Sequence, residues 1–436
     1  MAWAIAAALS LHAVLQIGAS PGDFEAMKKD IQAIVESRAA AYNCSFSVAI
    51  ASPSLGGTLK FASEGTTTQT KFAWGSITKM WTGASIMQLV ARGELKLDEP
   101  FAPYVDAQFA AMKKMSFPGM DFVKSSDLWG PEVEKVTIRN LLHMQSGIPD
   151  FDTANPSPTG KDVDPFRATV YAHPKKDYLL PELLSLPWVA THNLTSYPGY
   201  GFHYSSVNFG LLGLILAHHA GVADYRDFDQ SSFIPKELAG VARTIDWAQR
   251  GSPRENGVVT GFDRTDYNGQ DPKHGGESVI DVHGVFSGWS ASDFVGPPSA
   301  VAELGYALWG KLSLLVPEYY RDMMVPWPLD QTFYGFASQN VGLMGITGGD
   351  TAYGHLGATY GYDSILGYNP KLDLAMAIAT NIETQTQTQP SDAFCQVYNR
   401  VKNYLLKEPA QTCKYVVSSY YIGTCTCKSP EDAVVV

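Results

Sequence analysis

The 436-residue chain contains few cysteines, no excess of basic residues and no long hydrophobic run after its first 20 residues. Five cysteines are too few for a disulfide-stabilised scaffold, and the odd number leaves at least one without a partner in the chain. Lys and Arg number 32 against 43 Asp and Glu, a net charge of −11. Neutralising phosphates requires clustered basic residues, so the composition argues against nucleic-acid binding.

Recognisable metal and phosphate motifs are also missing. The chain has no His-Glu-x-x-His, no paired Cys-x-x-Cys and no glycine-rich phosphate loop after a predicted strand. We therefore expect neither a catalytic metal nor a cofactor.

The N-terminus differs from the rest of the chain. Residues 2–18 are apolar apart from three polar positions, and the first basic residue is Lys28. This pattern predicts a signal peptide over residues 1–20 and a secreted protein, the alternative being an uncleaved membrane anchor. No later run is long enough for a further span. Sequons at Asn43 and Asn193 predict glycosylation in a eukaryotic secretory pathway.

Three of the five cysteines lie near the C-terminus. Cys425 and Cys427 are too close in sequence to pair comfortably with each other. Cys413, Cys395 and Cys44 are their candidate partners. We expect residues 409–436 to form a tail that is either anchored by one disulfide or left loose, with no part in the chemistry.

The remaining composition is typical of a folded enzyme. Hydrophobic residues make up 45% and charged residues 17%, which excludes a disordered chain or a coiled coil. Aromatic residues reach 12%, which favours extensive packed surface and a substrate cleft.

Hydrophobic periodicity predicts strands at both ends of the chain and helices in the middle. Two segments, 104–134 and 151–186, are predicted to be long loops or insertions that shape the cleft. The pattern predicts an α/β (α+β) fold in which residues 22–100 and 271–408 form one domain and residues 101–270 an inserted, mainly helical one. The predicted elements are helices over 24–42, 77–91, 209–217 and 391–406, a hairpin of 46–50 with 59–62, and strands over 364–368 and 375–379.

The strongest chemical signal is a single Ser-x-x-Lys tetrapeptide formed by Ser76 and Lys79. A serine hydroxyl needs an adjacent base to act as a nucleophile. Residues three apart at the start of a helix are neighbours, which brings the Lys79 amine within reach of the Ser76 hydroxyl. A lysine among apolar groups loses part of its preference for the charged form and can serve as that base.

A rival motif, Gly18-Ala19-Ser20-Pro21-Gly22, fits the Gly-x-Ser-x-Gly nucleophile elbow. It lacks a preceding strand, has proline directly after the serine and overlaps the predicted cleavage point. We therefore reject it as the nucleophile.

Two further segments complete the candidate site. Tyr204 precedes a glycine-punctuated apolar helix, and a tyrosine hydroxyl near a lysine and a serine can relay a proton. Residues 353–358 contain two glycines that permit close approach of a substrate to the backbone. Taken singly, Tyr204 could be a packed aromatic residue and the glycines turn residues.

With these motifs the chain resembles the serine β-lactamase-related family, which includes class C β-lactamases, D-alanyl-D-alanine carboxypeptidases and esterases. The resemblance covers roughly residues 45–406 and extends to the segments 93–100 and 136–147 and to Pro198-Gly199. It implies a β-lactamase/transpeptidase-like fold, an antiparallel sheet flanked by helices.

The resemblance also implies roles for individual residues. Ser76 is the nucleophile, Lys79 its base and Tyr204 the proton shuttle. His355 and Gly357 stand in the family's Lys-Thr-Gly or His-Thr-Gly strand motif. The backbone N–H groups of Ser76 and Ala358 would form the oxyanion hole.

Two departures from the family pattern narrow the expected substrate. Ser206 stands where β-lactamases have the asparagine of Tyr-x-Asn, and we do not expect Asn208 to substitute for it. His355 replaces a fixed cation and is mostly neutral at pH 7, since its ordinary pKa is about 6.5. The expected substrate is thus a small ester or peptide and not an antibiotic.

The leading hypothesis is a secreted serine hydrolase that forms an acyl-enzyme on an ester or amide substrate. One alternative is a catalytically inactive relative that binds ligands or serves a structural role. Another is a D-amino-acid peptidase or carboxypeptidase with the same mechanism.

Overall fold

The computed structural model describes residues 21–152, 164–265, 276–311, 313–326 and 334–413. The predicted signal peptide and the two last cysteines lie outside these residues. Within them, no helix is both long and apolar enough to cross a membrane.

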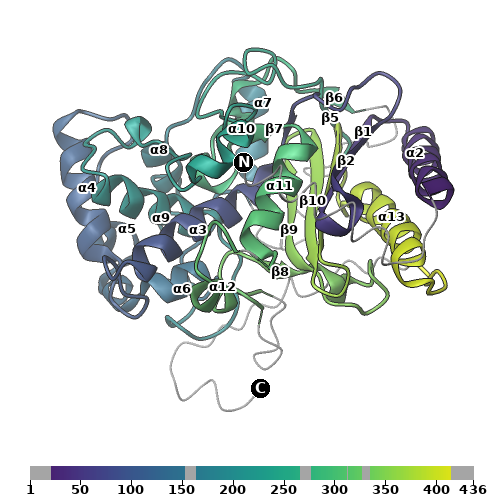
Figure 1. Ribbon diagram of the computed structural model, residues 1–436. Helices are drawn as coiled ribbons and strands as arrows, with labels where there is room; N and C mark the ends of the chain where they lie inside the picture. Colours follow the sequence, from purple (N-terminus) through teal and green to yellow (C-terminus); the bar gives the residue numbers. More distant parts are fainter. Residues whose placement is uncertain (1–20, 153–163, 266–275, 312, 327–333, 414–436) are drawn as a thin grey trace.

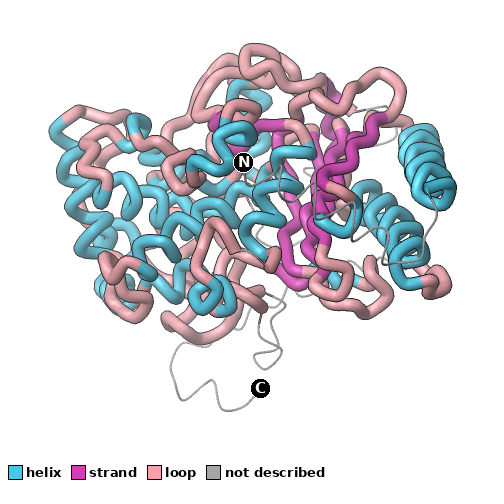
Figure 2. The backbone as a smooth tube through the Cα atoms, in the orientation of Figure 1, coloured by secondary structure: helices cyan, strands magenta, loops and turns pink. Residues whose placement is uncertain are grey.

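A six-stranded antiparallel sheet forms the centre of one half of the molecule (Figures 1 and 2). The first strand of the chain, residues 46–52, pairs on one side with residues 57–62, which form one edge of the sheet. On its other side it pairs with residues 374–380 near the C-terminus, where Phe46 faces Thr380. The strands in spatial order are β2 (Gly57–Ala62), β1 (Phe46–Ser52), β11 (Leu374–Thr380), β10 (Tyr362–Asn369), β9 (Tyr353–Thr359) and β8 (Gln339–Asn340).

Helices cover both faces of this sheet. Helices α2 (Pro21–Tyr42) and α13 (Thr388–Leu406) pack against each other and on one face, while α11 (Pro298–Trp309) packs on the other. Large side chains such as Val48 and Met376 point to the α2/α13 side, and the alternating alanines 49 and 377 point to the α11 side. Because both faces are buried, these strands read as continuous apolar runs.

Helices dominate the other half (Figure 2). Helix α9 (Ser206–His219) is apolar on every side because α3 (Thr78–Ala91), α4 (Ala102–Lys114) and α6 (Ile138–Leu142) surround it. The shorter helices are α5 (Ser125–Trp129), α7 (Pro165–Ala172), α8 (Leu180–Leu184), α10 (Ala239–Ala242) and α12 (Glu318–Asp322).

Two small sheets connect the halves. The first joins β3 (Phe72–Ala73), β7 (Phe294–Gly296) and β4 (Asp246–Trp247), and the second joins β12 (Ile382–Glu383), β5 (Phe262–Asp263) and β6 (Glu277–Ser278). Strands from residues 101–270 thus pair with strands outside that range, and the boundary at residue 270 stays a prediction.

Most predicted elements are confirmed, each with its ends shifted by a few residues. The prediction of a long loop over 104–134 is wrong in part. Residues up to Lys114 belong to α4, whose buried Val105, Phe109 and Met112 lie on one helical face. The described part of 151–186 also contains two short helices, α7 and α8.

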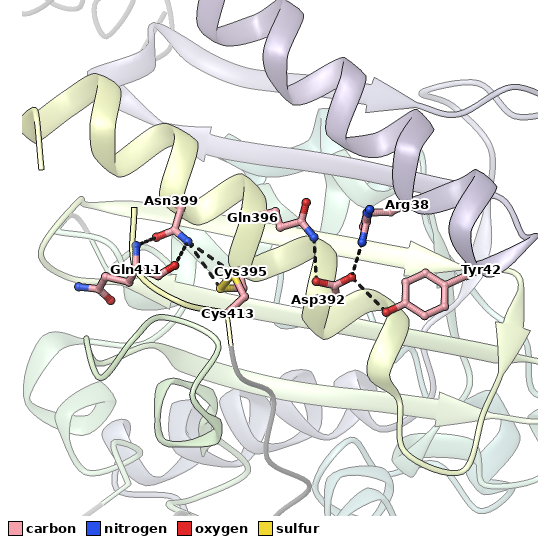
Figure 3. The surroundings of a disulfide bond; sticks show 8 residues. All are labelled: Arg38, Tyr42, Asp392, Cys395, Gln396, Asn399, Gln411 and Cys413. Atoms are coloured by element: carbon pink, nitrogen blue, oxygen red, sulfur yellow. Dashed lines mark hydrogen bonds and ion pairs between the residues drawn. A yellow bond between two sulfur atoms is a disulfide. The ribbon is translucent and has the colours of Figure 1, made fainter. Parts of the chain in front are cut away.

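A disulfide joins Cys395 on α13 to Cys413 (Figure 3). Cys44 is a free cysteine. On the same helix, Asp392 accepts hydrogen bonds from Arg38 (3.0 Å) and Tyr42 (3.1 Å) of α2. The disulfide holds the segment after α13 against that helix, and the two hydrogen bonds of Asp392 hold α13 against α2. They lie in the half of the molecule that holds α2, and no predicted site residue takes part in them.

Candidate active site

Ser76 lies in a tight turn that the surrounding chain holds in place. The turn is the 3₁₀ helix η2 (Gly75–Ile77), which leads directly into α3. The Thr78 hydroxyl donates to the Gly75 carbonyl (2.7 Å) and accepts from the Phe294 amide (3.1 Å). Its neighbours in the sequence are buried, but Ser76 itself is partly exposed. The fold therefore presents this hydroxyl to solvent from a fixed backbone.

Lys79 lies one turn further along and is completely buried. Its Nζ atom is 2.8 Å from Ser76 Oγ and 3.1 Å from the carbonyl oxygen of Ala291. Burial lowers the pKa of Lys79 to about 8, against the opposing effect of nearby Asp152 and Asp150. About a tenth of this amine is therefore uncharged at pH 7, far more than for an ordinary lysine, and that fraction can accept the Ser76 proton.

Tyr204 lies beside this pair, just before α9. The Lys79 Nζ atom is 5.1 Å from the centroid of the Tyr204 ring. The same ring lies 6.1 Å from the Tyr334 ring, edge to face, and 6.3 Å from the His355 ring. Three segments far apart in the sequence thus meet around Ser76.

Strand β9 packs against η2 so closely that both need glycine. A Cβ atom at Gly357 would lie 2.1 Å from the Trp74 carbonyl oxygen, and one at Gly75 would lie 2.3 Å from the Ala358 carbonyl oxygen. The Ser364 hydroxyl donates to the same Trp74 carbonyl (3.1 Å). The backbone of the η2 turn is thereby held directly against the strand.

The direction of the β9 amides follows from its hydrogen bonds. The Leu356 amide donates to the side-chain oxygen of Gln339 (2.9 Å), on the side of β9 away from β10. Amides two residues apart in a strand point the same way, so the Ala358 amide points to that side as well. Strand β8 pairs with residues 353 and 354 of β9 and does not extend to Ala358. At Ala358, η2 packs against this edge of β9 in place of β8.

His355 is not free to bind a substrate carboxylate in this structure. Its side chain is completely buried, Nδ1 contacts the Leu356 carbonyl oxygen, and Nε2 lies 3.0 Å from the Tyr334 hydroxyl. A carbonyl only accepts hydrogen bonds, so Nδ1 carries the proton and Tyr334 donates to Nε2. Burial and the nearby Lys79 charge lower the pKa of His355 to about 3, so the ring is neutral.

Ser206 begins α9 and faces two carboxyl groups that the sequence motifs did not indicate. The Ser206 amide donates to Asp150 Oδ1 (2.8 Å), and its hydroxyl interacts with Asp152. Asn208 is buried and accepts a hydrogen bond from Ser146 (2.7 Å), so it does not replace the family's asparagine.

Sequence analysis missed Asp150, Asp152 and Tyr334. Asp150 lies three residues after the motif that ends at Gly147, and its separation from Asp152 by Phe151 alone is the signal that was available. Tyr334 stands in no motif, and only the fold brings it to His355. Among the described residues, no group of three or more His, Cys, Asp or Glu side chains could hold a metal ion.

The chain matches one family model over most of its length and one known protein over part of its length. The family model described as Beta-lactamase matches residues 50–394. Protein flp of Staphylococcus aureus is 30% identical over 147 residues, which are 34% of this chain and 23% of that protein, so the match spans about a quarter of the relative's length.

Solved structures share the fold at low sequence identity. A D-amino acid amidase from Ochrobactrum anthropi SV3, complexed with L-phenylalanine amide, is 20% identical with a TM-score of 0.63 and covers 86% of this chain and 99% of its own. A D-stereospecific amidohydrolase from Streptomyces sp. is 17% identical (TM-score 0.61; 87% and 98% coverage). An octameric penicillin-binding protein homologue from Pyrococcus abyssi is 19% identical (TM-score 0.58; 88% and 78%).

Proposed function

This chain belongs to the beta-lactamase family, and on that premise we propose that it is a serine hydrolase that forms an acyl-enzyme on Ser76. The observation that carries the proposal is the 2.8 Å contact between the Ser76 hydroxyl and the buried Lys79 amine. A buried lysine with a lowered pKa has no evident structural use. Next to a solvent-accessible hydroxyl it has the chemistry of a general base.

In the acylation step, Ser76 Oγ attacks the substrate carbonyl carbon and its proton passes to Lys79. The carbonyl oxygen becomes negatively charged and receives hydrogen bonds from the amides of Ser76 and Ala358. Tyr204, beside the Lys79 amine, relays a proton to the leaving nitrogen or oxygen, and the carbon–heteroatom bond breaks. Water then attacks the acyl-enzyme, with its proton taken up by the same groups, and releases the acid.

We propose an amide or ester of an amino acid, with a free ammonium group, as the substrate class. Next to Ser206 the site offers the carboxyl groups of Asp150 and Asp152, and His355 is neutral. Such surroundings favour a substrate cation over the carboxylate of a β-lactam. The D-amino acid amidase and the D-stereospecific amidohydrolase with this fold support D-amino-acid amides as the first compounds to test.

The proposal is tested by labelling followed by a substrate panel. A fluorescent phosphonate should modify the wild-type protein on Ser76 and leave Ser76→Ala unlabelled. Ser85→Ala is the matched control, because Ser85 lies on the same helix and its hydroxyl donates to the Trp81 carbonyl (2.9 Å), away from Ser76 and Lys79 in the part of the chain that the structure describes. If the wild type is not labelled, the proposed mechanism is wrong and the catalytically inactive alternative is favoured.

D- and L-phenylalanine amides, an aryl ester, a D-alanyl dipeptide and a chromogenic β-lactam then distinguish the substrate classes. We expect the D-amide or the ester to be hydrolysed fastest. Preferential hydrolysis of the dipeptide would favour the peptidase alternative. Fastest turnover of the β-lactam would contradict the substrate proposal while leaving the mechanism intact.

We also propose that the protein is secreted. The Cys395–Cys413 disulfide suits an oxidising compartment, and the sequon residues Asn43 and Asn193 are both exposed. N-terminal sequencing of the exported protein should begin near residue 20, and glycosidase treatment should lower its apparent mass if the sequons are used. Retention inside the cell with an intact N-terminus would contradict secretion.

A further inference from the structure

The turn after β9 lies next to the proposed oxyanion site. Tyr360 and Gly361 form this turn and join β9 to β10, where Thr359 faces Tyr362. Ala358 is two residues before Tyr360, roughly 7 Å along the strand. A displacement of the turn would therefore reach the Ala358 amide, and whatever holds the turn also fixes the direction of that amide.

Contacts from segments that are distant in the sequence hold this turn. The Gly361 amide donates to Glu383 Oε2 of β12 (3.1 Å), and the Gly361 carbonyl accepts from the Phe262 amide of β5 (3.2 Å). The guanidinium of Arg167 on α7 lies 4.5 Å from the centroid of the Tyr360 ring. The turn is thus tied to two strands of a small sheet and to a helix of the other half of the molecule.

Arg167 in turn fixes the Glu383 side chain. Glu383 Oε1 accepts from Arg167 Nη2 (2.7 Å) and Oε2 accepts from Nη1 (2.8 Å), which makes the pair bidentate. Both side chains are buried, 5% and 3% exposed. Because two parallel hydrogen bonds allow the carboxylate a single orientation, Oε2 is held in the direction of the Gly361 amide.

Glu383 is one of three buried carboxyl groups around the Arg167 guanidinium. The others are those of Asp164 and Asp263. Asp164 also accepts from the Arg167 amide at the start of α7, and Asp263 accepts from the Thr265 hydroxyl (2.8 Å). One carboxylate balances one cation, so charge pairing alone does not account for a third buried acid. The hydrogen bond to the turn gives Glu383 a use beyond charge pairing.

We propose that Glu383, held by Arg167, is a positioning residue for the hydrolysis: it fixes the turn after β9 and thereby the Ala358 amide that receives the oxyanion. This inference rests on the proposed oxyanion site formed by the Ser76 and Ala358 amides. Glu383 acts through the Gly361 amide and the end of β9, and not through contact with the reacting atoms.

The test compares the hydrolysis of 4-nitrophenyl acetate with that of its thiono analogue, in which sulfur replaces the carbonyl oxygen. Sulfur is larger and accepts hydrogen bonds less well, so two aligned amides favour the oxygen ester. Glu383→Ala removes the acceptor of the Gly361 amide. It should lower the oxygen-to-sulfur rate ratio about tenfold, less than the factor of 10²–10³ for loss of an entire oxyanion donor. A smaller amount of folded protein would lower both rates equally and leave the ratio unchanged.

Glu383→Gln is the conservative variant. Its amide oxygen can take the place of Oε2 and continue to accept from the Gly361 amide, so the ratio should return to the wild-type value.

Asp263→Ala is the matched control. Asp263 faces Glu383 in the pairing of β5 with β12 and contacts the same Arg167 guanidinium. Its other hydrogen bonds among the described residues are to Tyr171 and Thr265, which lie outside the turn. Its ratio should equal that of the wild type. An unchanged ratio in Glu383→Ala, or an equal fall in Asp263→Ala, overturns the inference.

Hydrogen exchange provides a measurement that needs no substrate. Peptides that cover residues 356–362 should exchange faster in Glu383→Ala than in the wild type, and at the wild-type rate in Asp263→Ala. If Glu383→Ala does not fold, Glu383→Asp decides, because its shorter side chain keeps the charge but cannot hold both Arg167 and the Gly361 amide.

The wild-type protein separates this inference from the proposed function. A wild type that neither cleaves the ester nor reacts with the phosphonate overturns the proposed function. Equal cleavage of the oxygen and sulfur esters by the wild type contradicts the proposed oxyanion site and, with it, the inference. A discriminating wild type with an unchanged ratio in Glu383→Ala overturns only the positioning role of Glu383.

Discussion

The contact between η2 and β9 can be tested by replacing Gly75 with alanine. The new Cβ atom would lie 2.3 Å from the Ala358 carbonyl oxygen, 2.6 Å from its carbon and 2.9 Å from its nitrogen. All three are backbone atoms of a paired strand, so none can rotate away. Gly75 also has φ of +52°, a left-handed conformation that other residues adopt at a cost.

The expected loss of stability has two parts. The left-handed backbone costs about 1–2 kcal/mol in a residue with a side chain. Overpacking against the strand adds about 1–3 kcal/mol. We therefore expect Gly75→Ala to lower the free energy of unfolding by about 2–5 kcal/mol. The variant should also separate the Ser76 and Ala358 amides, and loss of one oxyanion donor lowers kcat by about 10²–10³-fold.

Urea unfolding measures the stability and phosphonate labelling measures the site. Gly56→Ala is the matched control, since Gly56 has φ of +77° and a Cβ atom at this position would meet no other atom within 4 Å. Gly56→Ala should lose only the stability that the left-handed backbone costs, and it should be labelled as fully as the wild type. A Gly75→Ala variant within about 0.5 kcal/mol of the wild type, a difference usual for neutral surface changes, would refute the packing account.

Four further outcomes follow from the site and the buried charges. Ser76→Ala should abolish ester turnover while its thermal midpoint stays near the wild-type value; retained turnover would exclude Ser76 as nucleophile. Lys79→Ala should lower the labelling rate by about 10²–10⁴-fold, and a mild effect would indicate another base. Burial raises the pKa of Asp293 to about 7, so this carboxyl group stabilises the fold at low pH and loses that contribution as pH rises from about 4 to 7. The free energy of unfolding of Asp293→Asn should therefore rise relative to that of the wild type across that interval, by up to about 4 kcal/mol in urea titrations. A difference that stays constant with pH would show that burial does not raise the pKa of Asp293. Arg167→Met leaves three buried carboxylates without their cation and should cost about 3–5 kcal/mol at pH 7, with a smaller loss at pH 5.

The sequence predicted those parts of the fold that depend on local periodicity. Strand β1, helix α3 and strands β10 and β11 have strong apolar patterns, because each is largely buried. The sequence predicts a long loop or insertion over 104–134 in place of most of helix α4, because proline and glycine in the surrounding segment obscure the helical pattern.

The site was predictable where a short motif contains the chemistry. Ser76 and Lys79 are three residues apart, so helical geometry alone places them together. Asp150 and Tyr334 reach the site only through tertiary packing, and no spacing in the sequence encodes their distance from Lys79. The enclosure of His355 by Tyr334 likewise depends on a segment 21 residues away.

The order of strands in the sheet has a consequence for synthesis of the protein. Strand β1 is completed early, but its partner β11 lies near the other end of the chain; the Ser45 amide binds Asn381, 336 positions later. At about 5–20 residues per second, roughly 15–70 s separate the translation of these two positions. Ser76 is made in the first fifth of the chain but meets β9 only afterwards, when residues 353–359 have left the ribosome. The nascent chain therefore carries the proposed nucleophile without the proposed oxyanion site for most of translation, and the proposed activity would arise only in its final stage.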